Sequence, residues 1–301
     1  MDKWAYILAP SYSGSTLLTF LLAAHPEVAT IGELKASAMG DIERYDCSCG
    51  MRIRSCPFWE NVRRQMDRRG ASFDLANFGT QFRTEGHPLA NRILTTRLRS
   101  PMFECMRGIA TRVHPGVRRV VARALERNRM LSEVILDLQS GTVFLDGSKD
   151  PIRLKYMHDS GLWDIKVIYL VRDGRGATNS YMKHYGASMR VAALEWRRTH
   201  AAIERLRARL PEGSWVKIRY EDLCRDVDRT LGKVFAHLCV ESDAASREWL
   251  AVENHILGNS MRLGSRSEIR LDEKWKAELS NTDIETFDRL AGDMNRKYGY
   301  D

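Results

Sequence analysis

Short apolar runs alternate along the chain with polar turns and with segments of helical spacing. The clearest runs are residues 4–9, 166–171 and 214–219, and each leads into turn residues and then a helical pattern. Runs of this length and composition predict β-strands, and strands that alternate with helices favour a parallel sheet. Residues 142–145 and 28–31 are shorter candidates for further strands. The pattern therefore predicts an α/β fold, a parallel sheet flanked by helices, with ligands at the carboxyl ends of the strands.

Between residues 57 and 138 the pattern becomes helical and strongly basic, with arginine pairs such as Arg63 and Arg64. We interpret this segment as a helical insertion or cap within a single domain that spans residues 1–301. An arginine-rich helix surface that faces water explains the same pattern, as does a surface that binds an acidic partner. The sequence leaves these two explanations open.

The composition is ordinary for a globular protein, with 44% hydrophobic and 29% charged residues. No apolar run approaches the roughly 20 residues that a membrane span requires, so we expect a soluble protein. Residues 1–4 lead directly into an apolar run without the basic start or the cleavage site of a signal peptide. The six cysteines do not form the dense pattern of a disulfide scaffold, which also favours a cytoplasmic location. The net charge of +8 favours anionic ligands without choosing among them.

A turn of small residues, 10–16, joins the first predicted strand to an apolar helical segment. This order gathers backbone N–H groups and the positive end of a helix dipole around one point, which suits a phosphate or sulfate. The turn lacks the first glycine and the lysine of a Walker A loop. A serine-rich helix start without any ligand is the alternative. The candidate anion-binding residues are Ser11, Tyr12, Ser13, Gly14, Ser15, Thr16 and Leu17.

A second turn follows the strand at residues 166–171 and begins with Arg172-Asp173-Gly174-Arg175. Ser180 comes 180 − 172 = 8 positions after Arg172, a little over one turn into the predicted helix. The guanidinium and the hydroxyl could therefore converge on one phosphate. An ion pair between Arg172 and a carboxylate is the structural alternative.

Taken together and in this order, the two turns resemble those of the sulfotransferases that use 3′-phosphoadenosine 5′-phosphosulfate (PAPS). In that family the first turn binds the 5′-phosphosulfate, and an Arg-Asp-x-Arg segment with a following serine binds the 3′-phosphate. The resemblance extends from Tyr6 to about Trp275 and is thin between residues 57 and 138. It implies the P-loop-like sulfotransferase fold, PAPS as the donor and 3′,5′-bisphosphoadenosine as a product. No metal is required, because a sulfuryl group carries less negative charge than a phosphoryl group.

Further segments resemble the tyrosylprotein and carbohydrate branch of that family and its bacterial relatives. Glu33 falls on the position of the catalytic glutamate, and Lys149 on that of the lysine that approaches the phosphosulfate. Tyr220, in Arg-Tyr-Glu-Asp-Leu, would lie near the adenine or simply end a buried strand. Residues 258–275 look like the loop that closes over the nucleotide, with Arg270 as its candidate ligand.

One position departs from the family pattern. Tyr12 stands where a lysine or arginine usually lies next to the transferring sulfate. The expected charge stabilisation therefore shifts to Lys149, which we predict to be catalytic together with Glu33 as the general base.

The predicted function is transfer of a sulfuryl group from PAPS to an acceptor hydroxyl by in-line displacement. The acceptor, a carbohydrate, glycolipid, peptide or small molecule, is acidic if the arginine-rich segment binds it. One alternative is a nucleotide-dependent kinase, disfavoured by the missing Gly-Lys pair and by the absence of a clear metal-binding carboxylate after a strand. Another is a noncatalytic module for anionic polymers. The enzyme is expected to need no nucleic acid, and a homodimer is compatible with the sequence.

Three cysteines, Cys47, Cys49 and Cys56, lie within ten positions of one another. Their spacing is not one of the usual Cys-x₂₋₄-Cys pairs of zinc sites. We expect buried thiols and no metal site, with zinc held by these cysteines and a distant histidine as the alternative.

Overall fold

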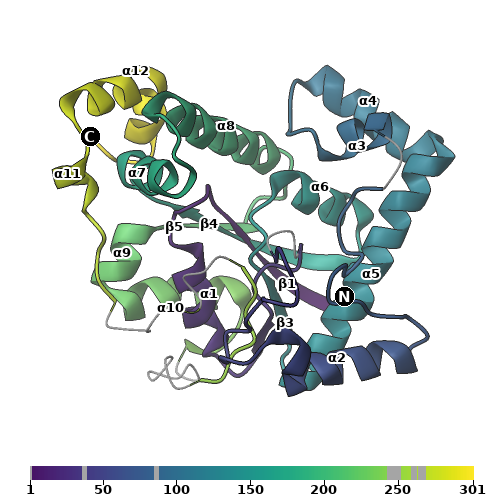
Figure 1. The fold of residues 1–301 in the computed structure, drawn as a ribbon. Coiled ribbons are helices and arrows are strands. Elements are labelled where there is room, and N and C mark those ends of the chain that lie inside the picture. The colour runs from purple at the N-terminus through teal and green to yellow at the C-terminus, as the bar shows by residue number, and fades with distance from the viewer. Residues whose placement is uncertain (1, 36–38, 85–87, 243–251, 259–262, 264–268) are drawn as a thin grey trace.

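The computed structural model describes residues 2–35, 39–84, 88–242, 252–258, 263 and 269–301. Among them, five strands form one parallel sheet in the order β2-β3-β1-β4-β5 (Figure 1). The strands are β1 (Asp2–Leu8), β2 (Val28–Thr30), β3 (Val143–Asp146), β4 (Trp163–Val171) and β5 (Trp215–Arg219). The predicted α/β class and all the predicted strands are confirmed, because apolar runs that are buried on both faces are typical of parallel strands.

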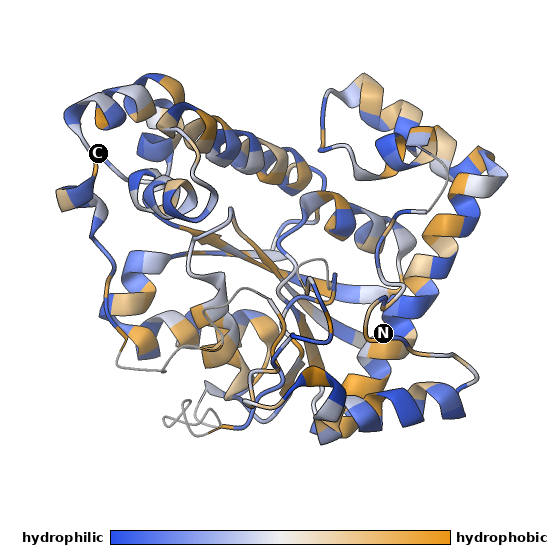
Figure 2. Ribbon diagram, viewed as in Figure 1, coloured by the Kyte–Doolittle hydropathy of each residue, from blue (hydrophilic) through white to orange (hydrophobic). Residues whose placement is uncertain are grey.

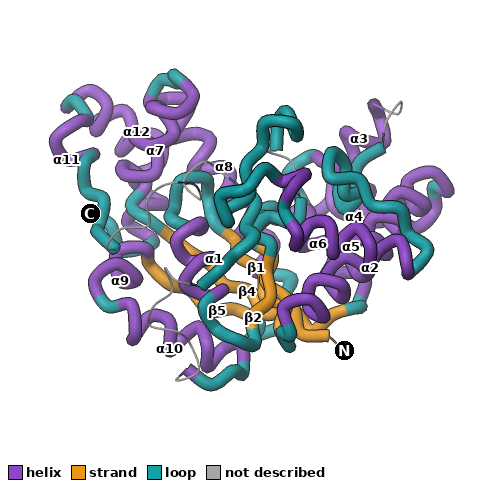
Figure 3. The backbone as a smooth tube through the Cα atoms, turned by 60° about the horizontal axis from the view of Figure 1, so that its bottom comes forward, coloured by secondary structure: helices purple, strands orange, loops and turns teal. Residues whose placement is uncertain are grey.

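Helices cover both faces of the sheet, as Figures 2 and 3 show. Alternate residues of a strand point to opposite faces, so Tyr6 and Leu8 belong to one buried cluster and Ala5 and Ile7 to the other. The larger cluster packs against α5 (Pro115–Gln139), α6 (Pro151–Ser160), α7 (Gly174–Tyr185), α8 (Met189–Arg207) and α12 (Asn281–Lys297). The smaller cluster packs against α1 (Ser15–Ala23), α9 (Tyr220–Arg225) and α10 (Val227–Leu238).

The segment predicted to be helical contains α2 (Pro57–Arg68), α3 (Pro88–Thr95), α4 (Pro101–Val113) and most of α5. Each of these helices begins at a proline, whose missing N–H and fixed φ suit the first helical position. A short 3₁₀ helix (Ile53–Ser55) precedes them, and α11 (Trp275–Glu278) precedes α12. In the part of the chain that is described, no helix is long and apolar enough to cross a membrane. The division into one domain with an insertion stays a prediction.

Many arginines of this helical segment pair with acidic side chains of the same segment. Ion pairs join Arg63 to Glu60 and Asp67, Arg69 to Glu133 and Asp137, and Arg129 to Glu126 and Glu133. Exposed pairs of this kind contribute little stability. Residues 57–138 hold 15 arginines and 8 acidic residues, so a net charge of 15 − 8 = +7 remains in the segment. The solvated surface and the surface for an acidic partner both stay open.

Candidate functional site

The residues predicted for the site follow successive strands of the sheet. Glu33 follows β2, Lys149 follows β3, the first turn follows β1, Arg172 follows β4 and Tyr220 follows β5. Because the strands are parallel, these residues lie along one edge in the order of the strands. With neighbouring strands about 4.8 Å apart, the strand ends before Glu33 and Arg172 are separated by about 14 Å. The sheet order thus arranges the predicted residues as one elongated site.

The first turn forms the start of α1 around Gly14. This glycine has a φ of 88° and precedes the helix, and no side chain of the described residues caps α1. A Cβ atom at Gly14 would lie 2.4 Å from the Tyr220 ring, so only glycine fits. The Ser13 hydroxyl oxygen is buried without a hydrogen-bond partner among the described residues. Uncapped N–H groups and an unpaired buried hydroxyl form a cradle that suits an anion.

Tyr12 lies in an aromatic cluster and supplies no positive charge to the first turn. Its ring lies 5.5–6.2 Å from those of Tyr181, His184 and Tyr185. Burial, together with the neighbouring Tyr185, raises the pKa of Tyr12 well above its usual value. Its φ of 64° is unusual for a residue with a side chain. The Tyr12 carbonyl accepts a 2.8 Å hydrogen bond from Arg172, which ties the first turn to the second.

Arg172 is the first residue of the second turn, and its side chain is almost fully buried. It lies over the Tyr220 ring at 4.6 Å and donates to the Asp272 carboxylate at 3.1 Å and to the Asp272 carbonyl at 3.0 Å. Burial raises the pKa of Asp272, but the charge of Arg172, the hydrogen bond from the Lys274 backbone N–H and that from Arg172 outweigh it and hold the pKa below its usual value. The ion pair with a carboxylate that the sequence left open is therefore present, with Asp272 as the partner.

Ser180 lies 180 − 174 = 6 positions after the first residue of α7. Its hydroxyl donates to the Gly176 carbonyl at 3.1 Å, and a Cβ atom at Gly176 would lie 3.2 Å from the Arg172 guanidinium. Arg172 and Ser180 thus border the same first turns of α7. Asp173 instead pairs with Arg175 at 2.8 Å and caps this helix. Convergence of Arg172 and Ser180 on one phosphate stays a prediction.

Glu33 and Lys149 form an ion pair between the loops that follow β2 and β3. Both side chains are partly buried, with 17% and 20% of their surface exposed. Lys149 has a φ of 62°, a strained conformation that commonly marks a functional position in a loop. Asp150 then caps α6, whose first residue is Pro151. The two residues predicted to be catalytic are therefore in contact, although their roles stay predictions.

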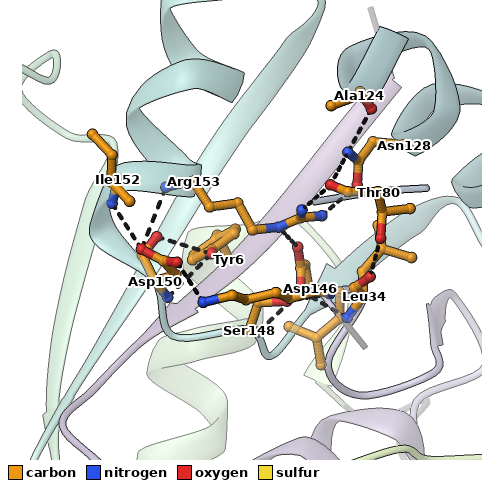
Figure 4. Close-up of polar contacts among 12 residues, drawn as sticks. Tyr6, Leu34, Thr80, Ala124, Asn128, Asp146, Ser148, Asp150, Ile152 and Arg153 are labelled. Atoms are coloured by element: carbon orange, nitrogen blue, oxygen red, sulfur yellow. Dashed lines mark hydrogen bonds and ion pairs between the residues drawn. The ribbon is translucent and has the colours of Figure 1, made fainter. Parts of the chain in front are cut away.

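Asp146, at the end of β3, connects the loops that carry Glu33 and Lys149 (Figure 4). Its Oδ1 atom accepts from the backbone N–H of Leu34 at 3.2 Å and from that of Ser148 at 2.9 Å. Leu34 and Ser148 are the direct neighbours of Glu33 and Lys149, the candidate catalytic pair. The Asp146 carboxylate therefore holds the two loops in position relative to each other.

Arg153 completes this network from α6. It donates to Asp146 Oδ2 at 3.0 Å, to the Thr80 carbonyl at 2.7 Å and to the Asn128 side chain, as Figure 4 shows. The exposed fractions of the Arg153 and Asp146 side chains are 2% and 0%. This pair was not predicted from the sequence. An acidic residue at the end of an apolar run was the available signal, but its partner depends on how α6 packs.

Two clefts border the site. The one beside Arg172 is lined largely by charged side chains, including Arg175, Arg219, Arg225 and Lys276. The other is lined by Lys35, Gln81, Phe82, Arg83, Leu94, Thr95, Asp150, Ile152 and Arg153. Lys35 and Asp150 pair at 2.7 Å and are close in sequence to Glu33 and Lys149. The second cleft therefore lies next to the candidate catalytic pair.

The remaining predictions concern the C-terminal loop and the cysteines. Arg270 is exposed, and residues 259–262 and 264–268 of the predicted nucleotide-covering loop lie outside the described residues. Cys47, Cys49 and Cys56 lie together with His255, with all four ligand atoms within 4.8 Å of one another. In the part of the chain that is described, these are the side chains whose chemistry and placement could hold a metal ion.

Comparisons with known proteins gave one family model and several solved structures of similar fold. A model described as the sulfotransferase family matches residues 6–244. The sulfotransferase domain from the curacin biosynthetic pathway is 18% identical, with a TM-score of 0.51 over all of this chain and 99% of that domain. Sulfotransferase STF9 from Mycobacterium avium is 13% identical, with a TM-score of 0.52 over 100% of this chain and 78% of that one. A search of curated proteins found no match.

Proposed function

The chain belongs to the sulfotransferase family and has its P-loop-like fold, and on that premise we propose that it transfers a sulfuryl group from PAPS to an acceptor hydroxyl. The observation that supports this most is the row of groups along one sheet edge. An anion cradle at the first turn lies between the Glu33–Lys149 pair on one side and Arg172 on the other. PAPS carries one phosphate at its 3′ position and another at its 5′ position, and the sulfuryl group on the 5′-phosphate must face the acceptor. The order of groups along the edge matches this arrangement.

The residues of the edge fit such a donor. The unpaired Ser13 hydroxyl and the uncapped start of α1 would bind the 5′-phosphosulfate. Arg172 and Ser180 would bind the 3′-phosphate, because a guanidinium presents several N–H donors to phosphate oxygens. Tyr220 packs under Arg172 and against Gly14, so it would support both binding turns more than stack on adenine.

When bound, PAPS supplies an activated sulfuryl group on a bisphosphate leaving group. The Glu33 carboxylate would take the proton from the acceptor hydroxyl while that oxygen bonds to sulfur and the bond from sulfur to the bisphosphate oxygen breaks. The Lys149 ammonium and the N–H groups at the start of α1 stabilise the negative charge that develops on the leaving side. The ion pair between Glu33 and Lys149 holds the base and the cation next to each other before the acceptor arrives.

The cleft beside α6 is the proposed acceptor site. It combines apolar side chains, Phe82 and Leu94, with the polar groups of Lys35 and Arg83. A cleft that is partly apolar with a few polar groups is typical of small-molecule sites. The acceptor class supported best is therefore an organic hydroxyl compound with an apolar body.

Thermal stability measured with adenosine 3′,5′-bisphosphate, AMP and ATP tests the donor. The bisphosphate at 100 times its dissociation constant should add about 2.7 kcal/mol and raise the unfolding midpoint by several degrees. Magnesium should not change this shift. The Arg172→Ala variant should respond to the bisphosphate and AMP alike, because it lacks the main 3′-phosphate donor.

Arg63→Ala, at an exposed position on α2, is the control and should keep the full response. If the unchanged protein shifted equally with AMP and the bisphosphate, the 3′-phosphate assignment would be wrong. A shift that appeared only with ATP and magnesium would favour a kinase instead.

A separate prediction concerns Asp272, which binds the guanidinium that the 3′-phosphate would use. Asp272→Asn keeps the size of the side chain but removes its negative charge. We expect the affinity for the bisphosphate to rise by up to about fivefold, the equivalent of an exposed ion pair worth about 1 kcal/mol. The modest size follows from the 37% exposure of the Asp272 side chain.

Isothermal titration of both nucleotides measures the effect. AMP affinity should stay the same, since AMP has no 3′-phosphate to compete with the carboxylate. A lower bisphosphate affinity in Asp272→Asn would mean that the carboxylate supports binding instead of competing with it.

A further inference from the structure

Four metal-ligating side chains converge at a place that the proposed reaction does not use. Cys47 and Cys49 belong to one tight turn, Cys56 precedes α2, and His255 comes from the segment 252–258. Cys47 and Cys56 are fully buried, and the other two side chains are partly buried. The two parts of the chain are about 200 residues apart in sequence, so the fold itself assembles the cluster.

Three of the six separations between ligand atoms fit a tetrahedral metal site, and the other three do not exceed 4.8 Å. Zinc bonds of about 2.3 Å to sulfur and 2.0–2.1 Å to nitrogen place tetrahedral neighbours about 3.8 Å apart for S···S and 3.5 Å for S···N. The Sγ atoms of Cys49 and Cys56 are 3.7 Å apart. His255 Nδ1 lies 3.4 Å from Cys47 Sγ and 3.4 Å from Cys56 Sγ. Each of these separations matches within a few tenths of an ångström.

We propose that Cys47, Cys49, Cys56 and His255 form a structural Zn²⁺ site with three thiolates and one imidazole. Tetrahedral sites of soft sulfur ligands with one histidine select zinc among the common divalent metals. All four positions are filled by protein, which is typical of structural and not of catalytic zinc. Binding releases the protons of the thiols. Because the four ligands meet only in the folded chain, metal binding is coupled to folding of this loop.

The surroundings hold the ligands in place. The backbone folds into a turn in which Cys47 N–H donates to the Met51 carbonyl at 2.8 Å and Gly50 N–H to the Cys47 carbonyl at 3.0 Å. The Ser48 hydroxyl donates to the Asn254 carbonyl at 2.5 Å, which joins this turn to the segment carrying the histidine.

The imidazole is oriented from two directions. The Phe58 ring stacks on His255 with centroids 4.2 Å apart and planes 6° from parallel. On the other ring nitrogen, Nε2 faces the Glu253 carboxylate at 3.6 Å. A carboxylate next to the free nitrogen of a ligating histidine is the usual second layer of such sites, and it leaves Nδ1 to bind the metal.

A zinc ion here would fix the position of the segment 252–258 next to the candidate catalytic site. Leu257 N–H donates to the Ile31 carbonyl at 2.7 Å, and a Cβ atom at Gly258 would lie 3.1 Å from Glu33 Oε1. The segment that carries His255 therefore runs directly past Glu33. The metal would hold this segment against the loop after β2, a positioning role that requires no contact with the reacting groups.

Elemental analysis of the full chain, expressed without a histidine tag and purified in reductant without chelators, tests the proposal. We expect about one zinc ion per chain. After the zinc is removed and replaced with Co²⁺, the visible spectrum should show tetrahedral bands and thiolate charge transfer. Protein that contains no zinc and gives no such spectrum with Co²⁺ overturns the proposal, as does a Cys49–Cys56 disulfide found by mass spectrometry of the freshly purified chain.

A pair of matched variants locates the metal. Cys56→Ser should weaken zinc binding by more than about 100-fold, measured in competition with a chromophoric chelator. Loss of a residue that only hydrogen-bonds a metal ligand already lowers metal affinity by up to about 100-fold, and Cys56 would be a ligand itself. Cys105→Ser, the same change at an exposed cysteine on α4, should retain all of the zinc. Equal zinc retention by both variants would place the metal elsewhere and refute the site. The Co²⁺ spectrum of the unchanged protein decides the question even if Cys56→Ser does not fold.

Discussion

Glutamine in place of Glu33 is expected to lower the rate of sulfuryl transfer by about 10²–10⁴-fold, the usual contribution of a general base. The amide has nearly the same shape but cannot accept the proton of the acceptor hydroxyl. Affinity for adenosine 3′,5′-bisphosphate should stay within about threefold, because Glu33 is not among the residues proposed to bind it. A threefold change corresponds to less than about 1 kcal/mol of binding free energy. Turnover with PAPS and an accepted hydroxyl compound, together with titration of the bisphosphate, measures both quantities.

Glu212→Gln is the matched control, since it makes the same change at an exposed residue. Its turnover should equal that of the unchanged protein. Near-normal turnover in Glu33→Gln would show that another group takes the proton. A large loss of bisphosphate affinity in the same variant would instead mean that Glu33 supports the donor site through Lys149.

The second large effect is expected from Arg153→Met, which keeps the volume of the side chain but breaks the buried pair with Asp146. Both side chains are almost completely buried, so the remaining carboxylate would lose its charged partner away from water. Removing one partner of a buried pair typically costs about 3–5 kcal/mol. For a protein of this size the unfolding midpoint should fall by roughly 6–20 °C. Urea unfolding followed by circular dichroism measures the free energy directly.

Arg63→Met provides the comparison, because Arg63 also pairs with two acidic residues but 49% of its side chain is exposed. Its free energy of unfolding should fall by less than about 1 kcal/mol. Similar losses of unfolding free energy in the two variants would show that the buried Asp146–Arg153 pair stabilises the fold no more than an exposed pair does. Because Asp146 also binds the loops next to Glu33 and Lys149, any folded Arg153→Met protein should also show reduced turnover.

The strands and the turns that follow them were predictable because their signals are local. Strands that are buried on both faces are continuous apolar runs in the sequence. Each helix from α2 to α6 begins at a proline, a residue that is favoured at the first helical position. The glycine of the first turn also has a local cause, since its φ of 88° is costly for other residues. The family pattern then pointed to Glu33 and Lys149, and the sheet order explains their contact.

Partners across long distances in sequence depended on packing. Asp272 comes 272 − 172 = 100 positions after the arginine it binds, and nothing near either residue marks the pair. The Asp146–Arg153 contact requires α6 to lie against the end of β3, and His255 reaches the three cysteines only because residues 252–258 run past β2. Local sequence determines which conformation each short segment adopts. Which charged or metal-binding groups meet is decided by the burial of many distant apolar residues at once.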